Sequence, residues 1–171
     1  MFLLALPSVL CGCARGTGDL KAVDNFQASR YMGTWYEVAR FPHWFERGLS
    51  HVTANYALRP DGKVSVTNRG YSAEKGKWTE ATAVAWFAGE PTVAHLRVRF
   101  FWPVWGNYRV VALDPDYRWA LVAGGSFDYL WILAREPSLP RETLDSVIAQ
   151  ARGLGFDTAR IEFPEQGNRP K

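Results

Sequence analysis

The side chains that could do acid–base or nucleophilic chemistry are few in this chain of 171 residues. The histidines are His43, His51 and His95. Ser50 and His51 are adjacent, but neighbouring residues of a strand point to opposite faces, so we do not expect a nucleophile–base dyad. Glu37 lies in a run of strand-forming residues and is interpreted as a structural carboxylate that is satisfied by hydrogen bonds. No nucleophile with its base emerges, so we do not predict an enzyme.

Metal and haem sites are not predicted either. Both cysteines, Cys11 and Cys13, lie near the start of the chain, and two thiolates without further ligands nearby make a poor metal site. A haem carrier would need a histidine that faces its cavity. His95 shares strand parity with Arg97 and Arg99 and should therefore face solvent. We expect no cofactor.

The composition indicates a single domain that is rich in strands. The chain is 47% hydrophobic and 15% aromatic, which is enough to build a core and favours aromatic-rich strands over a helical bundle. Its net charge is +3 and its pI about 9.0. Lysine and arginine are scattered rather than clustered, so nucleic acid is not the expected partner.

The start of the chain has the pattern of a lipoprotein signal. Residues 1–10 are apolar and uncharged, too short to span a bilayer, and they look like the apolar region of a secretory signal. Residues 10–13 read Leu-Cys-Gly-Cys and resemble the bacterial lipobox, although no basic segment precedes them. The resemblance implies cleavage after Gly12 and a lipid anchor, palmitate included, on Cys13. Ala14 in place of aspartate implies sorting to the outer membrane. A merely frayed apolar terminus is the alternative.

From residue 33 onward, short alternating runs are separated by turn residues at near-regular spacing, which predicts an all-β protein. Eight strands joined by hairpins can close into an up-and-down barrel with room for one small ligand. A helix at about 140–153 follows, because Pro140 suits a first helical turn and apolar residues recur at helical spacing. A short final strand is expected at 161–163. The expected strands are 34–42, 50–59, 63–72, 77–88, 92–101, 106–114, 117–124 and 128–135. The expected segments are a signal (1–12), a lipidated tether (13–24), the barrel with its helix (25–164) and a tail (165–171).

Three signatures in the expected order resemble the lipocalin family. The first reads Gly33-Thr34-Trp35, the second is the looser turn Asp114-Pro115-Asp116-Tyr117, and the third is Arg135 at the end of the eighth strand. The similarity covers residues 25–163 and is greatest to the bacterial outer-membrane lipoprotein lipocalins of the Blc type and to apolipoprotein D.

The resemblance implies which residues close the barrel and which line it. Gly33, Trp35 and Arg135 would form the closed end, with the guanidinium stacked on the indole ring. Similarity to apolipoprotein D implies a pocket with Tyr56, Asn68 and Trp131. Strand parity adds further lining residues. These are Val64, Val66, Leu96, Val98 and Phe100.

A cavity of this kind suits an acyl chain, and the resemblance implies a carrier of fatty acids or lysophospholipids at the periplasmic side of the bacterial outer membrane. Envelope maintenance under stress would be its role. The alternatives are a structural envelope lipoprotein without a ligand and a lipocalin-type enzyme.

An aromatic rim at the open end of the barrel is expected to touch lipid headgroups, because tryptophan and tyrosine favour the membrane interface. Its rings could instead fold inward and close the top, or mediate a homodimer. The rim residues are Trp44, Phe45, Phe101, Trp102 and Trp105.

Overall fold

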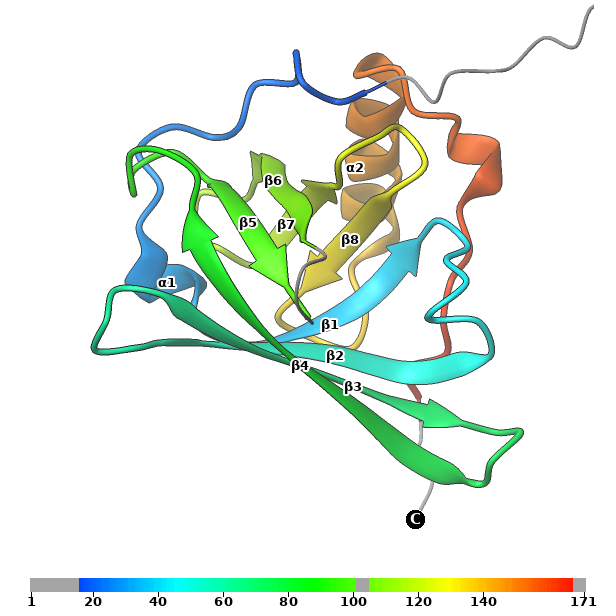
Figure 1. The fold of residues 1–171 in the computed structure, drawn as a ribbon. Coiled ribbons are helices and arrows are strands. Elements are labelled where there is room, and N and C mark those ends of the chain that lie inside the picture. Colours follow the sequence, from blue (N-terminus) through cyan, green and yellow to red (C-terminus); the bar gives the residue numbers. More distant parts are fainter. Residues whose placement is uncertain (1–15, 101–104, 168–171) are drawn as a thin grey trace, which may run out of the picture.

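The computed structural model describes residues 16–100 and 105–167 of the chain. Eight antiparallel strands pair in sequence order and close into a barrel, which confirms the predicted fold (Figure 1). The strands are β1 (Gly33–Arg40), β2 (Leu49–Leu58), β3 (Val64–Ser72), β4 (Lys77–Phe87), β5 (His95–Arg99), β6 (Gly106–Leu113), β7 (Trp119–Ala123) and β8 (Leu130–Ala134). The helices are α1 (Ala28–Tyr31), α2 (Arg141–Gly153) and the 3₁₀ helix η1 (Thr158–Arg160). Within the described residues, no helix is both long and apolar enough to cross a membrane.

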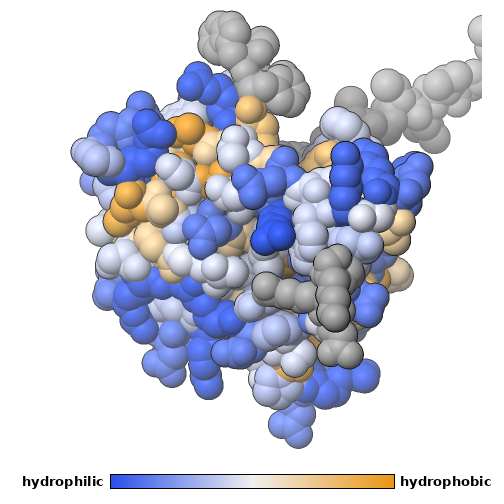
Figure 2. Space-filling view, turned by 90° about the horizontal axis from the view of Figure 1, so that it is seen from below, coloured by the Kyte–Doolittle hydropathy of each residue, from blue (hydrophilic) through white to orange (hydrophobic). Residues whose placement is uncertain are grey.

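The barrel has an apolar layer inside and a second one under α2. Alternation along each strand sends one set of side chains inward, so Val64 and Val66 of β3 are buried. β7 is buried on both faces because α2 covers its outer side, to which it contributes Val147 and Ala151. Figure 1 shows α2 behind β7 and β8, whereas the face over β2, β3 and β4 is mostly hydrophilic (Figure 2). The second apolar layer therefore lies where α2 packs on the outer side of the strands.

The closed end of the barrel is plugged by α1, which the sequence did not predict. The Trp35 ring is fully buried, and its Nε1 donates a hydrogen bond of 2.8 Å to the backbone oxygen of Tyr31. The Arg135 guanidinium lies 3.9 Å from the centroid of the Trp35 ring and donates hydrogen bonds to the backbone oxygens of Thr34 and Arg30. Gly33, the first residue of β1, has a φ of 91°, a conformation that favours glycine. The chain turns at this residue from α1 into β1. The stacked pair implied by the family resemblance is thus present.

Strands β1 and β2 pair only near the closed end and then separate. Their register runs over Gly33–Tyr36, after which a bulge interrupts β1 between Glu37 and Ala39. A second bulge interrupts β2 between Ser50 and Thr53. The two irregularities open a gap between neighbouring strands at the open end of the barrel.

The C-terminal segment fills this gap as a substitute strand. Arg40 and Glu162 exchange backbone hydrogen bonds of 3.0 and 2.8 Å, at the position where a short final strand was expected. The backbone nitrogen of His51 donates to the backbone oxygen of Glu165. The Gln166 side chain then donates to two backbone oxygens of β1 and β2. Glu165 and Gln166, which the sequence placed in the tail, are therefore part of the barrel wall.

The segment before α1 lies along the outside of the barrel. Thr17 is fully buried and donates a hydrogen bond from Oγ1 to the backbone oxygen of Gly124, in the loop between β7 and β8. The backbone of Val23 donates a hydrogen bond to Val110 of β6 and accepts one from Ala94, just before β5. Residues 17–23, expected to be a tether, are thus fixed to the strands.

Candidate ligand-binding site

The interior of the barrel holds a small cavity next to the closed end, with a volume of about 20 Å³. Ligand-binding clefts in proteins have volumes of roughly 300–1,000 Å³, whereas this cavity has room for about one water molecule. Its walls are almost entirely apolar or aromatic. The lining residues are Phe26, Tyr31, Met32, Tyr56, Val64, Ala85, Phe87, Leu96, Val98 and Tyr108. Such a lining favours an apolar ligand.

Three tyrosine hydroxyls form a chain at the floor of the cavity. The Oη atoms of Tyr31 and Tyr108 lie 2.6 Å apart, and those of Tyr56 and Tyr108 lie 3.0 Å apart. Burial raises the pKa of all three phenols, so they are neutral hydrogen-bonding groups. Sequence reasoning named only Tyr56. Tyr108 shares strand parity with the buried Val110, which is the signal that could have found it.

Most of the predicted lining residues face the interior. Val66 belongs to the inner core, and Asn68 points inward with its Oδ1 buried and without a partner among the described residues. Phe100 is the exception, because β5 ends at Arg99 and the ring is 46% exposed. It lines an open hollow on the side of the barrel with Arg59 and Arg99 instead, so its assignment to the cavity was wrong.

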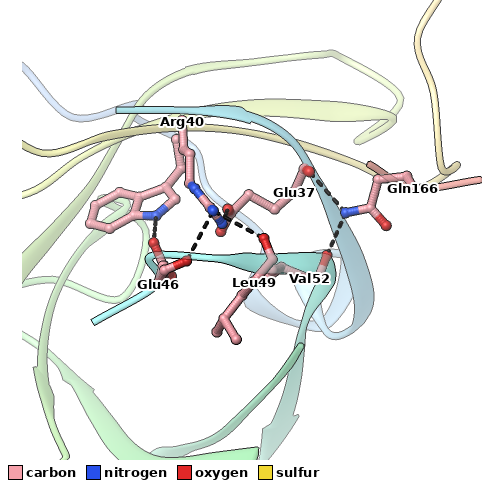
Figure 3. A network of polar contacts seen from close by, with 7 residues as sticks. Glu37, Arg40, Glu46, Leu49, Val52 and Gln166 are labelled. Atoms are coloured by element: carbon pink, nitrogen blue, oxygen red, sulfur yellow. Dashed lines mark hydrogen bonds and ion pairs between the residues drawn. The ribbon is translucent and has the colours of Figure 1, made fainter. Parts of the chain in front are cut away.

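Above the cavity, a buried polar network surrounds Arg40 (Figure 3). The bulge after Glu37 reverses the alternation of β1, so that the Arg40 side chain points into the barrel. Its Nη1 donates to Oε1 of Glu37 at 2.6 Å, and its Nη2 donates to the backbone oxygens of Glu46 and Leu49 at 3.0 and 3.1 Å. Trp131 donates from Nε1 to Oε2 of Glu46 at 3.2 Å. Arg40 therefore pairs with the carboxyl group of Glu37 and with the backbone of Glu46, whose carboxyl group accepts from Trp131.

The two carboxyl groups of this network are hard to ionise together. Burial, and then the charge of Glu46, raises the pKa of Glu37 from its usual 4.5 to about 8, although Arg40 opposes the shift. Burial also raises the pKa of Glu46, against the hydrogen bond from Trp131. Because burial and the charge of Glu46 both disfavour an ionised Glu37, a proton stays in the network at neutral pH.

Gln166 supports this network from behind. Its Nε2 donates to the backbone oxygen of Glu37 at 2.9 Å and to that of Val52 at 2.8 Å, as Figure 3 shows. Both oxygens belong to the stretches of β1 and β2 that the bulges have separated. The side chain thus takes over the hydrogen bonds that the interrupted ladder leaves unmade.

Comparisons with known proteins identify the family. Residues 26–166 match the family described as Lipocalin-like domain. The chain is a lipocalin.

Its relatives include bacterial and animal proteins. The lipocalin is 47% identical to the outer membrane lipoprotein Blc of Escherichia coli (strain K12), over 92% of this chain and 89% of that protein. It is 46% identical to Blc of Vibrio cholerae over 97% and 98% of the two chains, and 32% identical to apolipoprotein D of Macaca fascicularis over 86% and 81%. Insecticyanin of Manduca sexta shares the fold with a TM-score of 0.71 at 22% identity, over 86% and 84%.

These relatives assign the lipocalin to the bacterial outer membrane as a lipid-anchored protein. Lipocalins are generally carriers of small hydrophobic ligands rather than enzymes, which agrees with the apolar cavity. In the described part of the chain, no group of three or more histidine, cysteine, aspartate or glutamate side chains could hold a metal ion.

The open end of the lipocalin carries exposed aromatic rings around a buried histidine. Trp44 is 77% exposed, and Phe45 and Trp105 are about half exposed. His43 is buried, lies face to face with Phe45, and contacts the Trp131 ring. Burial, and then the charge of Arg40, lowers the pKa of His43 to about 4, so the imidazole is neutral. The predicted rim residues Phe101 and Trp102 lie outside the described residues.

Ser50 and His51 are closer together than sequence reasoning allowed. His51 has a φ of 54° inside the β2 bulge, which turns its side chain back toward its neighbour. The Ser50 Oγ and the His51 Nδ1 lie 2.8 Å apart and share a hydrogen bond. The argument that they point to opposite faces was therefore wrong. The contact is between adjacent residues.

Proposed function

We propose that this lipocalin binds fatty acids or lysophospholipids in its barrel and carries them at the periplasmic side of the outer membrane. The observation that carries the proposal is the apolar cavity, closed at one end by Trp35 and Arg135, with the buried polar network of Arg40 on its open side. In the cell this activity would serve envelope maintenance under stress.

The apolar walls would supply the free energy for binding an acyl chain once the lining side chains move apart to admit it, because the cavity itself has a volume of only about 20 Å³. Burying a methylene group is worth about 0.8 kcal/mol, so fifteen or so methylenes give roughly 12 kcal/mol in total. Association costs of about 4–15 kcal/mol offset much of this. We therefore expect affinities around the micromolar range and little selectivity for chain length.

The head of the ligand would lie at the Arg40 network. A carboxylate or phosphate there can compete for the guanidinium, because burial favours the protonated form of Glu37. The Nε of Arg40 and the Nε2 of His43 are buried and have no hydrogen-bond partner among the described residues. These two nitrogens could each form a hydrogen bond with the polar head of a ligand whose acyl chain fills the barrel.

The exposed rings of Trp44, Phe45 and Trp105 would touch the lipid headgroups and let a ligand pass into the barrel. Pairing of two copies through this rim is the alternative use of the same surface.

The test is a titration of residues 14–171 with a lysophospholipid and with a fatty acid, followed by tryptophan fluorescence. Trp131→Phe removes the indole at the network, and Trp119→Phe is the matched control, because Trp119 lies in the outer core under α2. We expect a saturable change in the wild type and in Trp119→Phe that is reduced in Trp131→Phe. A flat titration with both lipids would refute the proposal and favour a structural lipoprotein.

A further inference from the structure

The outer face of β3, β4 and β5 and the residue just before β6 carry three arginine–tryptophan pairs, which we call the basic face. The Arg69 guanidinium lies 4.4 Å from the centroid of the Trp78 ring. Arg97 lies 4.7 Å from Trp105, and Arg99 lies 5.8 Å from Trp86. The three arginines are exposed, and the rings are half-buried or exposed. Long cationic side chains on aromatic rings are suited to a membrane interface, where an apolar body meets a charged surface.

The charges on this face are unbalanced. The outward positions of β3 to β6 hold Arg69, Arg97, Arg99 and Arg109 against the single carboxylate of Glu80. Across the described ranges, no carboxylate lies within ion-pair distance of these four guanidinium groups.

Helix α2, on another side of the barrel, is balanced by comparison. It carries Arg141 and Arg152 together with Glu142 and Asp145, and Arg141 is paired with Asp145 at 2.7 Å. The basic face therefore carries an excess of positive charge that the surface of α2 does not.

The N-terminal segment begins next to the basic face. Arg109 donates hydrogen bonds from Nη1 to the backbone oxygen and Oγ1 of Thr17, which fixes this residue to β6. Thr17 also bonds to Gly125, which packs beside Asn107. Asn107 is the cross-strand partner of Arg97 on β5. The described chain thus starts roughly two strand spacings, about 10 Å, from Arg97.

This attachment limits where the lipid anchor can be. Gly16 lies three positions after Cys13, and an extended chain of that length spans at most roughly 11 Å. An anchor on Cys13 would then lie within roughly 21 Å of Arg97, which is about two to three Debye lengths at physiological ionic strength, so the tether keeps the basic face near the headgroups around the anchor.

We propose that the basic face docks on the headgroup surface of an anionic phospholipid bilayer, and that the short tether to Cys13 fixes this orientation. Two observations support this partner. The positive charge of the basic face is complementary to anionic headgroups, and the tether to Cys13 is short and starts beside this face. The inference rests on the proposed anchor at Cys13 and is independent of ligand binding in the cavity.

The experiment measures which side of the mature lipidated protein faces the membrane. The native cysteine at position 13 carries the lipid, so a fluorophore can be attached through Thr82→Cys, which is exposed on β4 between the pairs, or through Gln150→Cys on α2 as the control. Each labelled protein is reconstituted into vesicles of phosphatidylcholine with brominated chains, with or without 30% phosphatidylglycerol. No ligand is added.

We expect quenching of the label at position 82 in the anionic vesicles only, and none at position 150. An arginine near an anionic surface favours binding about fivefold, so Arg97→Gln with Arg99→Gln should shift the docking equilibrium by roughly 25-fold and abolish the quenching. Arg141→Gln with Arg152→Gln removes the same charge from α2 and should leave the quenching in place. Equal quenching at the two labelled positions, or quenching at position 82 that survives loss of Arg97 and Arg99, would overturn the proposal.

Discussion

Gln166→Ala is expected to destabilise the barrel far more than its position near the end of the chain suggests. The side chain donates hydrogen bonds to the backbone oxygens of Glu37 and Val52, where β1 and β2 no longer pair with each other. Removing it leaves two carbonyl oxygens without a donor inside the wall. Each lost hydrogen bond costs about 1 kcal/mol, and an unsatisfied buried acceptor adds to that, so we expect a loss of about 2–3 kcal/mol.

For a domain of this size, a loss of that magnitude lowers the melting temperature by roughly 5–10 °C. Urea unfolding followed by tryptophan fluorescence and circular dichroism measures the free energy of unfolding directly. Gln150→Ala is the matched control, because Gln150 is exposed on α2 and should change stability by no more than about 0.5 kcal/mol. A second variant, Gln166→Glu, keeps the size of the side chain but replaces the donor with an acceptor.

The second variant separates hydrogen bonding from packing. At neutral pH the carboxylate of Gln166→Glu cannot donate to either carbonyl, so the variant should be at least as unstable as Gln166→Ala. As the pH falls through the pKa of the new carboxyl, its protonated form regains one donor and part of the stability. If Gln166→Ala is as stable as Gln150→Ala, the C-terminal segment does not hold β1 and β2 together and the reasoning fails.

Two further predictions concern the network and the closed end. The pKa of Glu37 is about 8 in the folded protein against its usual 4.5, so folding takes up a proton in this window and wild-type stability should fall as the pH rises from about 4.5 to 8. Glu37→Gln should remove that fall, and urea unfolding at pH 5 and pH 8.5 measures it. If the stability of the variant falls with pH in parallel with that of the wild type, Glu37 is not the group that titrates. Arg135→Met loses the contact with Trp35 and two hydrogen bonds to backbone oxygens, and should cost about 2–3 kcal/mol in thermal unfolding. Arg135→Lys, which keeps the charge, should recover part of this; no recovery would argue against a role for the charge.

The sequence predicted the strand order and most of the cavity wall because both depend on a period of two residues. Leu96 and Val98 face inward, as their alternation with Arg97 indicates, and they line the cavity. The alternation was extended one residue too far at Phe100, because nothing in the pattern showed that β5 ends at Arg99. Strand ends depend on pairing with neighbours, which periodicity does not report.

The polar part of the site could not be predicted, because it depends on two bulges. A bulge adds one residue to one strand, so every side chain beyond it changes face. Strict alternation from Trp35 and Glu37 would put Arg40 outside the barrel, whereas the observed bulge brings it in. The same effect in β2 turned His51 toward Ser50. Neither bulge carries a glycine that would have indicated it.

The two bulges connect the site to the last residues of the barrel wall. They separate β1 from β2, which opens a gap, and the β1 bulge turns Arg40 into the barrel. A gap in a barrel exposes backbone groups that must find partners, and here Glu162 and Gln166 provide them. A straight β1 fully paired with β2 would need no C-terminal segment, but it would place the Arg40 guanidinium outside. The segment that follows α2 therefore supports the strands that carry the Arg40 network, although none of its side chains lines the cavity.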